Sequence, residues 1–258
     1  MRITKYAAID IGSNALRLLI SNVIEHKKET ITLKNSLVRV PIRLGQDAFT
    51  TGIISRYNIK QLSRSMKSFK NLMKVHDVKN YLAFATAALR EAKNGKYVID
   101  RVKKKSGINI QIIDGKKEAR IISNSNVFDG IDPNKTILYV DVGGGSTELS
   151  IIKNKKTLKS TSFKIGTVRL LNDGVDNETW IMAKKWVITN TKPFTNIFLL
   201  GTGGNINKLY KISNNNENKP LTYRKLRKIY KNLNSLSYEE RIIKFALNQD
   251  RSDVIIPA

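Results

Sequence analysis

Short apolar runs bounded by glycine or asparagine alternate with helical patterns along the whole chain. In the first half, alternation predicts strands at 6–11, 17–24, 29–41, 81–85 and 108–113, and helices at 55–75, 97–105 and 116–128. The second half repeats this order, with strands at 136–141, 148–153, 157–165 and 196–200, and helices at 178–189, 207–212, 222–233 and 238–247. Strands followed by helices, twice over, predict an α/β class with two lobes, 1–130 and 131–258. The boundary is placed at Gly130–Asn134, where glycine, aspartate and proline gather.

The stretch Tyr139–Ile152, YVDVGGGSTELSII, carries the most chemistry. A strand holding Asp141 stops at glycine, and a second strand resumes after Glu148. Glycines let backbone amides approach a ligand closely, and clustered N–H groups form a nest for an anion. The residues of the proposed phosphate turn are Gly143, Gly144, Gly145 and Ser146. An ordinary hairpin whose glycines only turn the chain accounts for the stretch equally well.

A second copy of this pattern stands near the N-terminus, at Ile9–Ile20, IDIGSNALRLLI. Aligning Asp10 with Asp141 places Gly12 on Gly143, and Ser13 and Asn14 on Gly144 and Gly145. Two copies of strand, aspartate, glycine-rich turn and strand indicate two related half-domains. We expect their phosphate loops to face each other across a cleft.

Composition limits the classes of protein that fit. A chain of 258 residues can bury a sizeable core. The chain has no cysteine, which excludes a disulfide framework, a thiolate metal site and a cysteine nucleophile. No apolar run approaches the roughly 20 residues that span a bilayer, and residues 1–12 do not resemble a signal peptide. We therefore expect a cytoplasmic protein without a membrane partner.

The formal net charge of +25 is spread along the chain in short clusters of lysine. A field of this sign attracts polyanions. A genome drifting toward A and T would also enrich lysine, isoleucine and asparagine, and we rank this explanation first. Help in binding an anionic substrate ranks second. Dedicated nucleic-acid binding ranks third and is not expected.

Several mechanisms of phosphate chemistry are excluded by what the sequence lacks. No Gly-Lys-Ser/Thr occurs, so there is no Walker A loop, and His26 and His76 lie in lysine-flanked, turn-like contexts outside any motif. Metal-assisted displacement remains, which needs carboxylates to hold a cation and to accept a proton from water. The candidate metal ligands are Asp10, Asp141 and Glu148, and the candidate general base is Glu118. On residues alone, Glu118 is better explained as a glutamate favoured by the dipole of a first helical turn.

The order and spacing of many segments resemble the exopolyphosphatase and guanosine pentaphosphate phosphatase (Ppx/GppA) family, within the superfamily of actin, sugar kinases and heat-shock chaperone ATPases. The segments are AAIDIGSNALRLLI, VPIRLGQDAFTTGIIS, FATAALREAKNGKYVIDRV, DGKKEARII, YVDVGGGSTELSII, SFKIGTVRLL, LGTGGNINKL and DRSDVIIPA. The resemblance implies two ribonuclease-H-like lobes flanking a central cleft that holds Mg2+ and a phosphate chain. It further implies a homodimer.

The resemblance also implies a role for each matching residue. Glu118 lies on the position of the family's catalytic glutamate, and Asp141 and Glu148 lie on acidic positions of the second phosphate motif. The remaining positions are phosphate-binding: Ser13, Asn14, Arg90, Gly143, Gly144, Gly145 and Ser146. Lys164, Gly166 and Arg169 fall on a basic segment near the cleft.

Two departures from the family pattern stand out. Lys116 and Lys117 precede Glu118, where the family usually has further acidic residues. They are expected either to weaken Glu118 as a base or to bind another phosphate. Family members also continue past the segment ending at Ala258, so we expect further C-terminal sequence.

The sequence therefore predicts a Mg2+-dependent phosphohydrolase acting on inorganic polyphosphate, with guanosine pentaphosphate as the second choice of substrate. A family member that binds polyphosphate or nucleotide without hydrolysis is a separate hypothesis. A kinase on the same scaffold is a third and the weakest.

Overall fold

The computed structural model describes the chain except for residues 28, 124–130, 133, 173 and 216–218. The chain divides into two compact units, residues 1–114 and 115–258. The division falls before the predicted boundary because the helix that starts at Gly115 contacts strands of the second unit. The predicted boundary at Gly130–Asn134 lies partly outside the described residues and stays a prediction.

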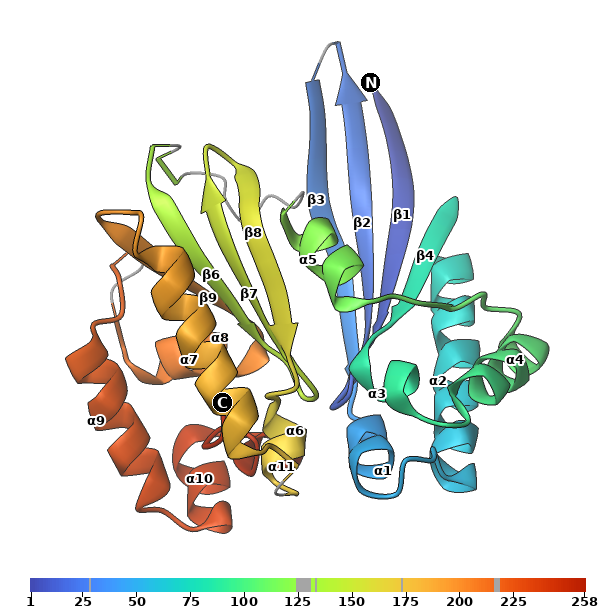
Figure 1. Ribbon diagram of the computed structural model, residues 1–258. Coiled ribbons are helices and arrows are strands. Elements are labelled where there is room, and N and C mark those ends of the chain that lie inside the picture. The colour runs from blue at the N-terminus through green and yellow to red at the C-terminus, as the bar shows by residue number, and fades with distance from the viewer. Residues whose placement is uncertain (28, 124–130, 133, 173, 216–218) are drawn as a thin grey trace. The chain divides into compact units, whose positions relative to one another are not determined.

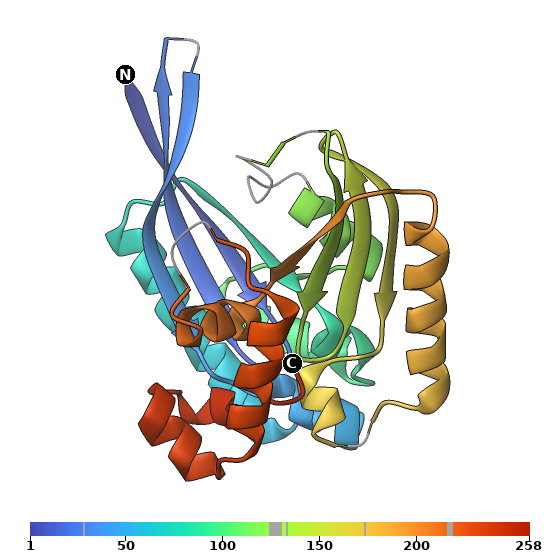
Figure 2. The ribbon, with the colours of Figure 1, turned by 90° about the vertical axis from the view of Figure 1, so that its left-hand side faces the viewer.

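The sheet of unit 1 has five strands in the order β3-β2-β1-β4-β5. The strands are β1 (Arg2–Ile11), β2 (Leu16–His26), β3 (Glu29–Val40), β4 (Asn80–Ala85) and β5 (Gln111–Ile112). β1, β2 and β3 form the predicted antiparallel meander, whose length is clear in Figure 2, and β4 and β5 add in parallel. The predicted strand at 108–113 is wrong in extent, because only two of its residues pair with β4.

The helices of unit 1 are α1 (Leu44–Thr50), α2 (Arg56–Val75), α3 (Ala87–Glu91) and α4 (Gly95–Ser106). α2 begins after Ser55, whose hydroxyl accepts a hydrogen bond from Asn58 N at 3.2 Å, as the predicted N-cap should. Leu62, Met66 and Phe69 are fully buried on one face of α2 and pack into the core of unit 1. The short helix α1 was not predicted from the sequence.

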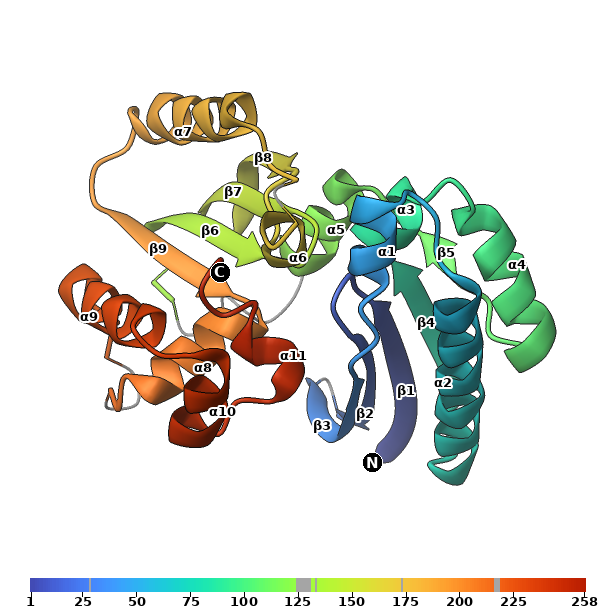
Figure 3. The ribbon, with the colours of Figure 1, turned by 90° about the horizontal axis from the view of Figure 1, so that it is seen from below.

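Unit 2 repeats the strand order of unit 1 as β8-β7-β6-β9. Its strands are β6 (Thr136–Val142), β7 (Thr147–Lys153), β8 (Lys156–Phe163) and β9 (Ile197–Thr202). Its helices are α5 (Gly115–Ser123), α6 (Thr167–Leu170), α7 (Asn177–Thr191), α8 (Gly204–Ile212), α9 (Tyr223–Asn234), α10 (Tyr238–Phe245) and α11 (Gln249–Ser252). Figure 3 shows α7 on one face of this sheet and α8 to α11 on the other. The predicted helix at 116–128 is observed to Ser123, and its remaining residues lie outside the described part of the chain.

The last described segment belongs to the core of unit 2. Ile255 is 2% exposed and packs in a cluster with Leu209, Ile229, Leu233 and Leu247. The two strand orders confirm the predicted α/β class with two ribonuclease-H-like lobes. None of the helices described is long and apolar enough to cross a bilayer.

The internal repeat is confirmed by register as well as by sequence. Asp10 pairs with Arg17 across β1 and β2, and Asp141 pairs with Glu148 across β6 and β7. Each turn is closed by the same backbone hydrogen bond, from Gly12 N to Ala15 O at 3.2 Å and from Gly143 N to Ser146 O at 2.9 Å. The residue opposite the aspartate on the neighbouring strand differs between the units. It is the cation Arg17 in unit 1 and the carboxylate Glu148 in unit 2.

Candidate active site

The glycine turn between β6 and β7 is held from one side by the segment that contains α6. The hydrogen bonds are Thr167 N to Gly143 O at 3.0 Å, Val168 N to Gly144 O at 2.9 Å, and Arg169 Nε to Gly145 O at 3.0 Å. In a trans peptide, a carbonyl and the next N–H point in opposite directions, and the described chain has no cis peptide. The N–H groups of residues 144, 145 and 146 therefore point away from α6. Three successive N–H groups on one side are the arrangement of an anion nest.

This close packing depends on Gly166, which precedes α6. A Cβ on this residue would lie 2.4 Å from Gly145 C and 2.5 Å from Gly144 C. Its φ of −144° is extended backbone that any residue adopts, so glycine is required here for space alone. In the described chain the glycines of positive φ are Gly52, Gly107 and Gly203, and those of the β6–β7 turn are not among them. A positive φ therefore does not account for the glycines of this turn, whereas space does at Gly143, where a Cβ would lie 3.0 Å from Ser146 O.

The two carboxylates of the second hairpin have different surroundings. Glu148 is 2% exposed, and its Oε1 accepts hydrogen bonds from Ser146 Oγ at 2.6 Å and Ser162 Oγ at 2.9 Å. Asp141 is half-buried at the end of β6, and a Cβ on Gly203 would lie 3.1 Å from its Oδ1. Glu148 therefore anchors the turn through Ser146, whereas Asp141 is the more accessible carboxylate beside it.

Tyr139 lies two residues before Asp141 and was not singled out by sequence reasoning. Its ring is 3% exposed, and its hydroxyl shares a hydrogen bond of 2.5 Å with Thr202 Oγ1 on β9. Burial raises the pKa of the Tyr139 hydroxyl well above its ordinary value, and the nearby charges of Asp141 and Glu148 raise it further. The sequence did contain a signal for Tyr139. It lies two residues before Asp141 on the same strand, and alternate residues of a strand lie on one face of the sheet.

Glu118 lies in the first turn of α5, as predicted. The helix starts against β8, where a Cβ on Gly115 would lie 2.8 Å from Ser162 Cβ. Ser162 in turn donates to Glu148, which accepts from Ser146 on the glycine turn. The Oε2 atom of Glu118 is shielded from solvent. The candidate base and the second glycine turn thus belong to one compact unit. Lys117 is exposed, and the side chain of Lys116 lies outside the described part of the chain.

The first hairpin presents a different electrostatic environment. Arg17 Nη1 lies 2.7 Å from Asp10 Oδ2, and both side chains are about half exposed. The turn is supported from α1, because Gly45 N donates to Ser13 O at 2.8 Å and Ser13 is 4% exposed. Asn14, the next residue of the turn, is half-buried. The ion pair occupies an oxygen of Asp10 that a cation would otherwise use.

Arg90 lies on α3, and its Nη1 donates to Ile113 O at 2.8 Å at the end of unit 1. The predicted site residues thus divide between the units: Asp10, Ser13, Asn14 and Arg90 in unit 1, and Glu118, Asp141, Gly143, Gly144, Gly145, Ser146 and Glu148 in unit 2. The cleft across which the two hairpins face each other stays a prediction.

The model of the Ppx/GppA phosphatase family matches residues 23–258. The chain belongs to this family. Among curated relatives of the Ppx/GppA chain, the bifunctional 3-dehydroquinate synthase/phosphatase of Fusobacterium nucleatum is 33% identical over 217 residues, which is 77% of this chain and 32% of the relative. Exopolyphosphatase 1 of Mycobacterium tuberculosis is 27% identical over 175 residues, which is 67% of this chain and 50% of the relative.

The guanosine-5'-triphosphate,3'-diphosphate pyrophosphatase of Aliivibrio fischeri is 31% identical over 166 residues, which is 64% of this Ppx/GppA chain and 32% of the relative. The chain therefore spans about a third to a half of the length of these curated relatives.

Solved structures agree with the fold. A crystal structure of an exopolyphosphatase from Cytophaga hutchinsonii superposes with a TM-score of 0.84 at 23% identity, covering 98% of this chain and 87% of that one. The Ppx/GppA family member of Aquifex aeolicus superposes with a TM-score of 0.74 at 25% identity, covering 99% and 87%. The family resemblance drawn from the sequence motifs is confirmed.

Proposed function

We propose that this chain is a phosphohydrolase that releases the terminal phosphate of a phosphoanhydride chain, with inorganic polyphosphate as its first substrate. Membership of the Ppx/GppA phosphatase family and similarity to exopolyphosphatase 1 of Mycobacterium tuberculosis support this choice. Guanosine pentaphosphate is the alternative, supported by similarity to the pyrophosphatase of Aliivibrio fischeri. We further propose that the protein acts in the cytoplasm as a homodimer.

One observation carries the proposal. The helix with Glu118 begins against Ser162, which is linked through Glu148 to Ser146 of the glycine turn. This packing within one unit supports a site in which the Glu118 carboxylate and the N–H groups of the glycine turn act on the same phosphate. A general base and a cradle for phosphate oxygens are the two groups that attack of water on a terminal phosphate needs from the protein.

In this mechanism the N–H groups of residues 144–146 hold the terminal phosphate, and the Ser146 hydroxyl orders the turn through Glu148. Glu118 accepts the proton of the attacking water. Ser13 and Arg90 of unit 1 are proposed to contact phosphates of the same chain. Phosphoryl transfer depends mostly on positioning and on neutralising charge, so a rigid turn is a direct contribution to the rate.

A divalent cation fits the carboxylates that remain accessible. Asp10 is engaged by Arg17 at 2.7 Å, and Glu148 Oε1 accepts hydrogen bonds from two serine hydroxyls. We propose Asp141, which is half-buried beside the glycine turn, as the main ligand. Within the described residues no group of three His, Cys, Asp or Glu side chains could hold a metal. Mg2+ normally uses one or two carboxylates together with substrate phosphates and water, so this arrangement suits it. Bound Mg2+ would neutralise charge on the phosphate oxygens.

The test is phosphate release from long-chain polyphosphate by the Glu118→Ala variant. Removing a general base should lower turnover about 10²- to 10⁴-fold while polyphosphate binding is largely retained. Glu178→Ala is the matched control, because Glu178 also lies in the first turn of a helix. This variant loses a glutamate that the helix dipole stabilises but no proposed catalytic group, so its turnover should be unchanged. Unchanged turnover of Glu118→Ala would remove this residue from catalysis.

A protein that binds the phosphate chain without hydrolysis is the second candidate, and the Asp10–Arg17 ion pair favours it. The two functions are separated by measuring phosphate release and polyphosphate binding side by side, with Mg2+ and with EDTA. Binding without Mg2+-dependent release would identify the binder.

A further inference from the structure

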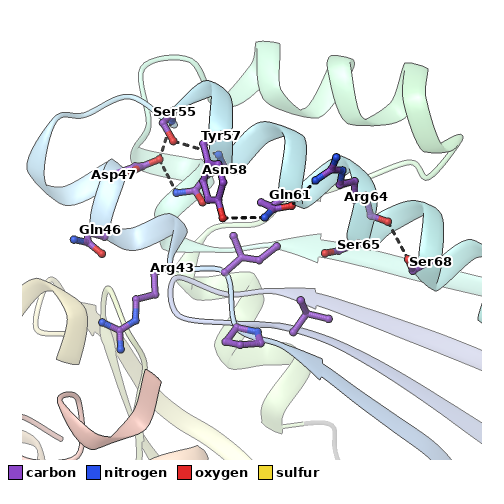
Figure 4. A pocket seen from close by; sticks show the side chains of 13 residues that line it. Arg43, Gln46, Asp47, Ser55, Tyr57, Asn58, Gln61, Arg64, Ser65 and Ser68 are labelled. Carbon is purple, nitrogen blue, oxygen red and sulfur yellow. Dashed lines mark hydrogen bonds between the residues drawn. The ribbon is translucent and has the colours of Figure 1, made fainter. Parts of the chain in front are cut away.

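The first three strands of unit 1 extend past the helix α2 that covers them. This helix is anchored at its start, where Asp47 Oδ2 of α1 accepts hydrogen bonds from Ser55 N and Asn58 Nδ2, both at 2.8 Å (Figure 4). The chain that leaves its other end reaches β1 at Lys5, whose carbonyl oxygen accepts a hydrogen bond from Lys79 N at 2.9 Å. Figures 1 and 2 show β1, β2 and β3 continuing beyond this end of α2. The helix therefore covers only part of their length.

The part of the sheet beyond α2 keeps the apolar pattern of the core. Ile3 on β1, Ile24 on β2 and Ile31 on β3 lie opposite one another across the three strands. Alternate residues of a strand share a face, so Ile24 lies on the face that carries Ile20, which is fully buried in the core of unit 1. On β3, however, Ile31 is 49% exposed and Leu33 is 50% exposed. Apolar side chains therefore continue along this face past the point where the core ends.

The strand that carries these two exposed residues is an edge strand. β3 is the first strand in the order β3-β2-β1-β4-β5 and pairs with β2 on one side. Natural proteins protect an exposed edge with lysine, proline or a very short strand. The edge strand β8 of unit 2 carries Lys156 and Lys159 in this way. On β3 the first lysine is Lys34, which follows the exposed apolar pair. An edge of this kind is a template for pairing with another strand.

The sequence of this edge is complementary to itself when two copies pair antiparallel. With Thr32 opposite Thr32 of a second copy, Ile31 of each copy lies opposite Leu33 of the other. The two copies of Lys34 are then well separated along the strands. Centring the pairing on Lys34 would place like charges opposite each other, and centring it on Leu33 would place Ile31 opposite Asn35. Thr32 is the centre that gives both apolar residues an apolar partner.

We propose that the protein forms its homodimer through residues 30–34 of β3, which join the unit 1 sheets of two copies by antiparallel pairing about Thr32. The inference rests on the homodimer of the proposed function and adds the surface that forms it. β3 pairs regularly with β2 along this segment, and the register shifts only at Asn35. Backbone hydrogen bonds supply the affinity of an edge-to-edge contact, and the apolar pairs fix its register.

The register can be tested directly because the chain has no cysteine. Residues opposite each other in an antiparallel pair have Cα atoms about 4.5–5.5 Å apart, which is within the range of a disulfide. Thr32→Cys should therefore form a covalent dimer under mild oxidation, detected on a non-reducing gel. Lys34→Cys is the control within the strand, because its two copies would lie about 14 Å apart. Thr157→Cys, which is exposed on β8, is the control for random collision.

Sedimentation velocity measures the association without a covalent link. The wild type should show a reversible equilibrium between monomer and dimer. Ile31→Thr/Leu33→Thr should raise the dissociation constant of the dimer about tenfold, because the two-fold axis repeats the lost apolar pair. Threonine keeps the β propensity of the strand, so the variant should fold. Leu158→Thr is the matched control, because Leu158 is 46% exposed on the edge strand β8, and it should leave the constant unchanged.

Two results would overturn the proposal: a wild type that stays monomeric at every concentration, or a dimer that neither the double variant weakens nor Thr32→Cys captures. The second result would leave the homodimer of the proposed function intact, formed through another surface. Phosphate release from polyphosphate is measured separately on the same proteins. Its loss in the wild type would refute the proposed hydrolysis and would not bear on the pairing of β3.

Discussion

The most discriminating prediction concerns Gly166, because its consequences follow from distances alone. Substituting Gly166→Ala adds a Cβ that would lie 2.4 Å from Gly145 C. Carbon atoms in contact prefer a separation of about 3.5–4.0 Å. The glycine turn and the α6 segment must therefore move apart by about 1 Å, and the obstacle is backbone, which cannot rotate aside as a side chain can.

A shift of this size breaks the hydrogen bonds that hold the turn. The bonds from Thr167 N and Val168 N, at 3.0 and 2.9 Å, would lengthen beyond the range of a real hydrogen bond. The bond from Arg169 Nε to Gly145 O, at 3.0 Å, is the third at risk. At about 0.5–1.5 kcal/mol for each net bond, the loss of two or three corresponds to about 1–4 kcal/mol of unfolding free energy.

Urea denaturation followed by tryptophan fluorescence measures this loss in the right part of the molecule. The chain has two tryptophans, Trp180 and Trp186, and both lie on α7 in unit 2. Tripolyphosphate binding at the glycine turn should weaken in the same variant, because the N–H groups of residues 144–146 lose their fixed direction.

Leu233→Ala separates this effect from general destabilisation. Leu233 is 1% exposed in the helical cluster of unit 2, and its truncation should cost about 2–5 kcal/mol without altering phosphate binding by the folded protein. Stability of Gly166→Ala within about 0.5 kcal/mol of the wild type, together with unchanged phosphate affinity, would refute the view that the α6 segment sets the geometry of the turn.

Three further predictions concern polar groups of the two hairpins. The raised pKa of Tyr139 means that above its ordinary value of 10.0 the unfolded chain loses a proton that the folded state keeps, so stability should fall as pH rises past about 10. Tyr139→Phe should flatten this dependence, and an alkaline absorbance titration in which all nine tyrosines of the folded protein ionise together would contradict the assignment. Ser162→Ala removes one of two hydroxyl donors to buried Glu148 and should cost about 1–3 kcal/mol in urea denaturation, whereas an unchanged midpoint would show that the bond contributes nothing. Arg17→Ala should cost less than about 1 kcal/mol, because its pair with Asp10 is about half exposed, and a larger loss would mean that Arg17 also supports the first turn.

The two hairpins could be predicted because their signals are local. Alternation fixes which residues of a strand share a face, and glycine with serine or asparagine between two short strands fixes where the chain reverses. The alignment of Asp10 with Asp141 is therefore confirmed in the structure. The two hairpins have the same strand register, and the same backbone hydrogen bond closes each turn. The long helix α2 and its Ser55 cap followed from the same kind of evidence.

Only the tertiary structure decided what these groups contact. Glu148 was predicted as a metal ligand because it flanks the glycine turn, and that role stays a prediction. The contacts of its Oε1 with Ser146 and with Ser162, which lies on another strand, could be seen only in the structure. The space that requires glycine at Gly166 belongs to another loop, so composition could not reveal it. Sequence determines local conformation because it acts over a few residues, whereas the role of a buried polar group depends on which distant segments pack around it.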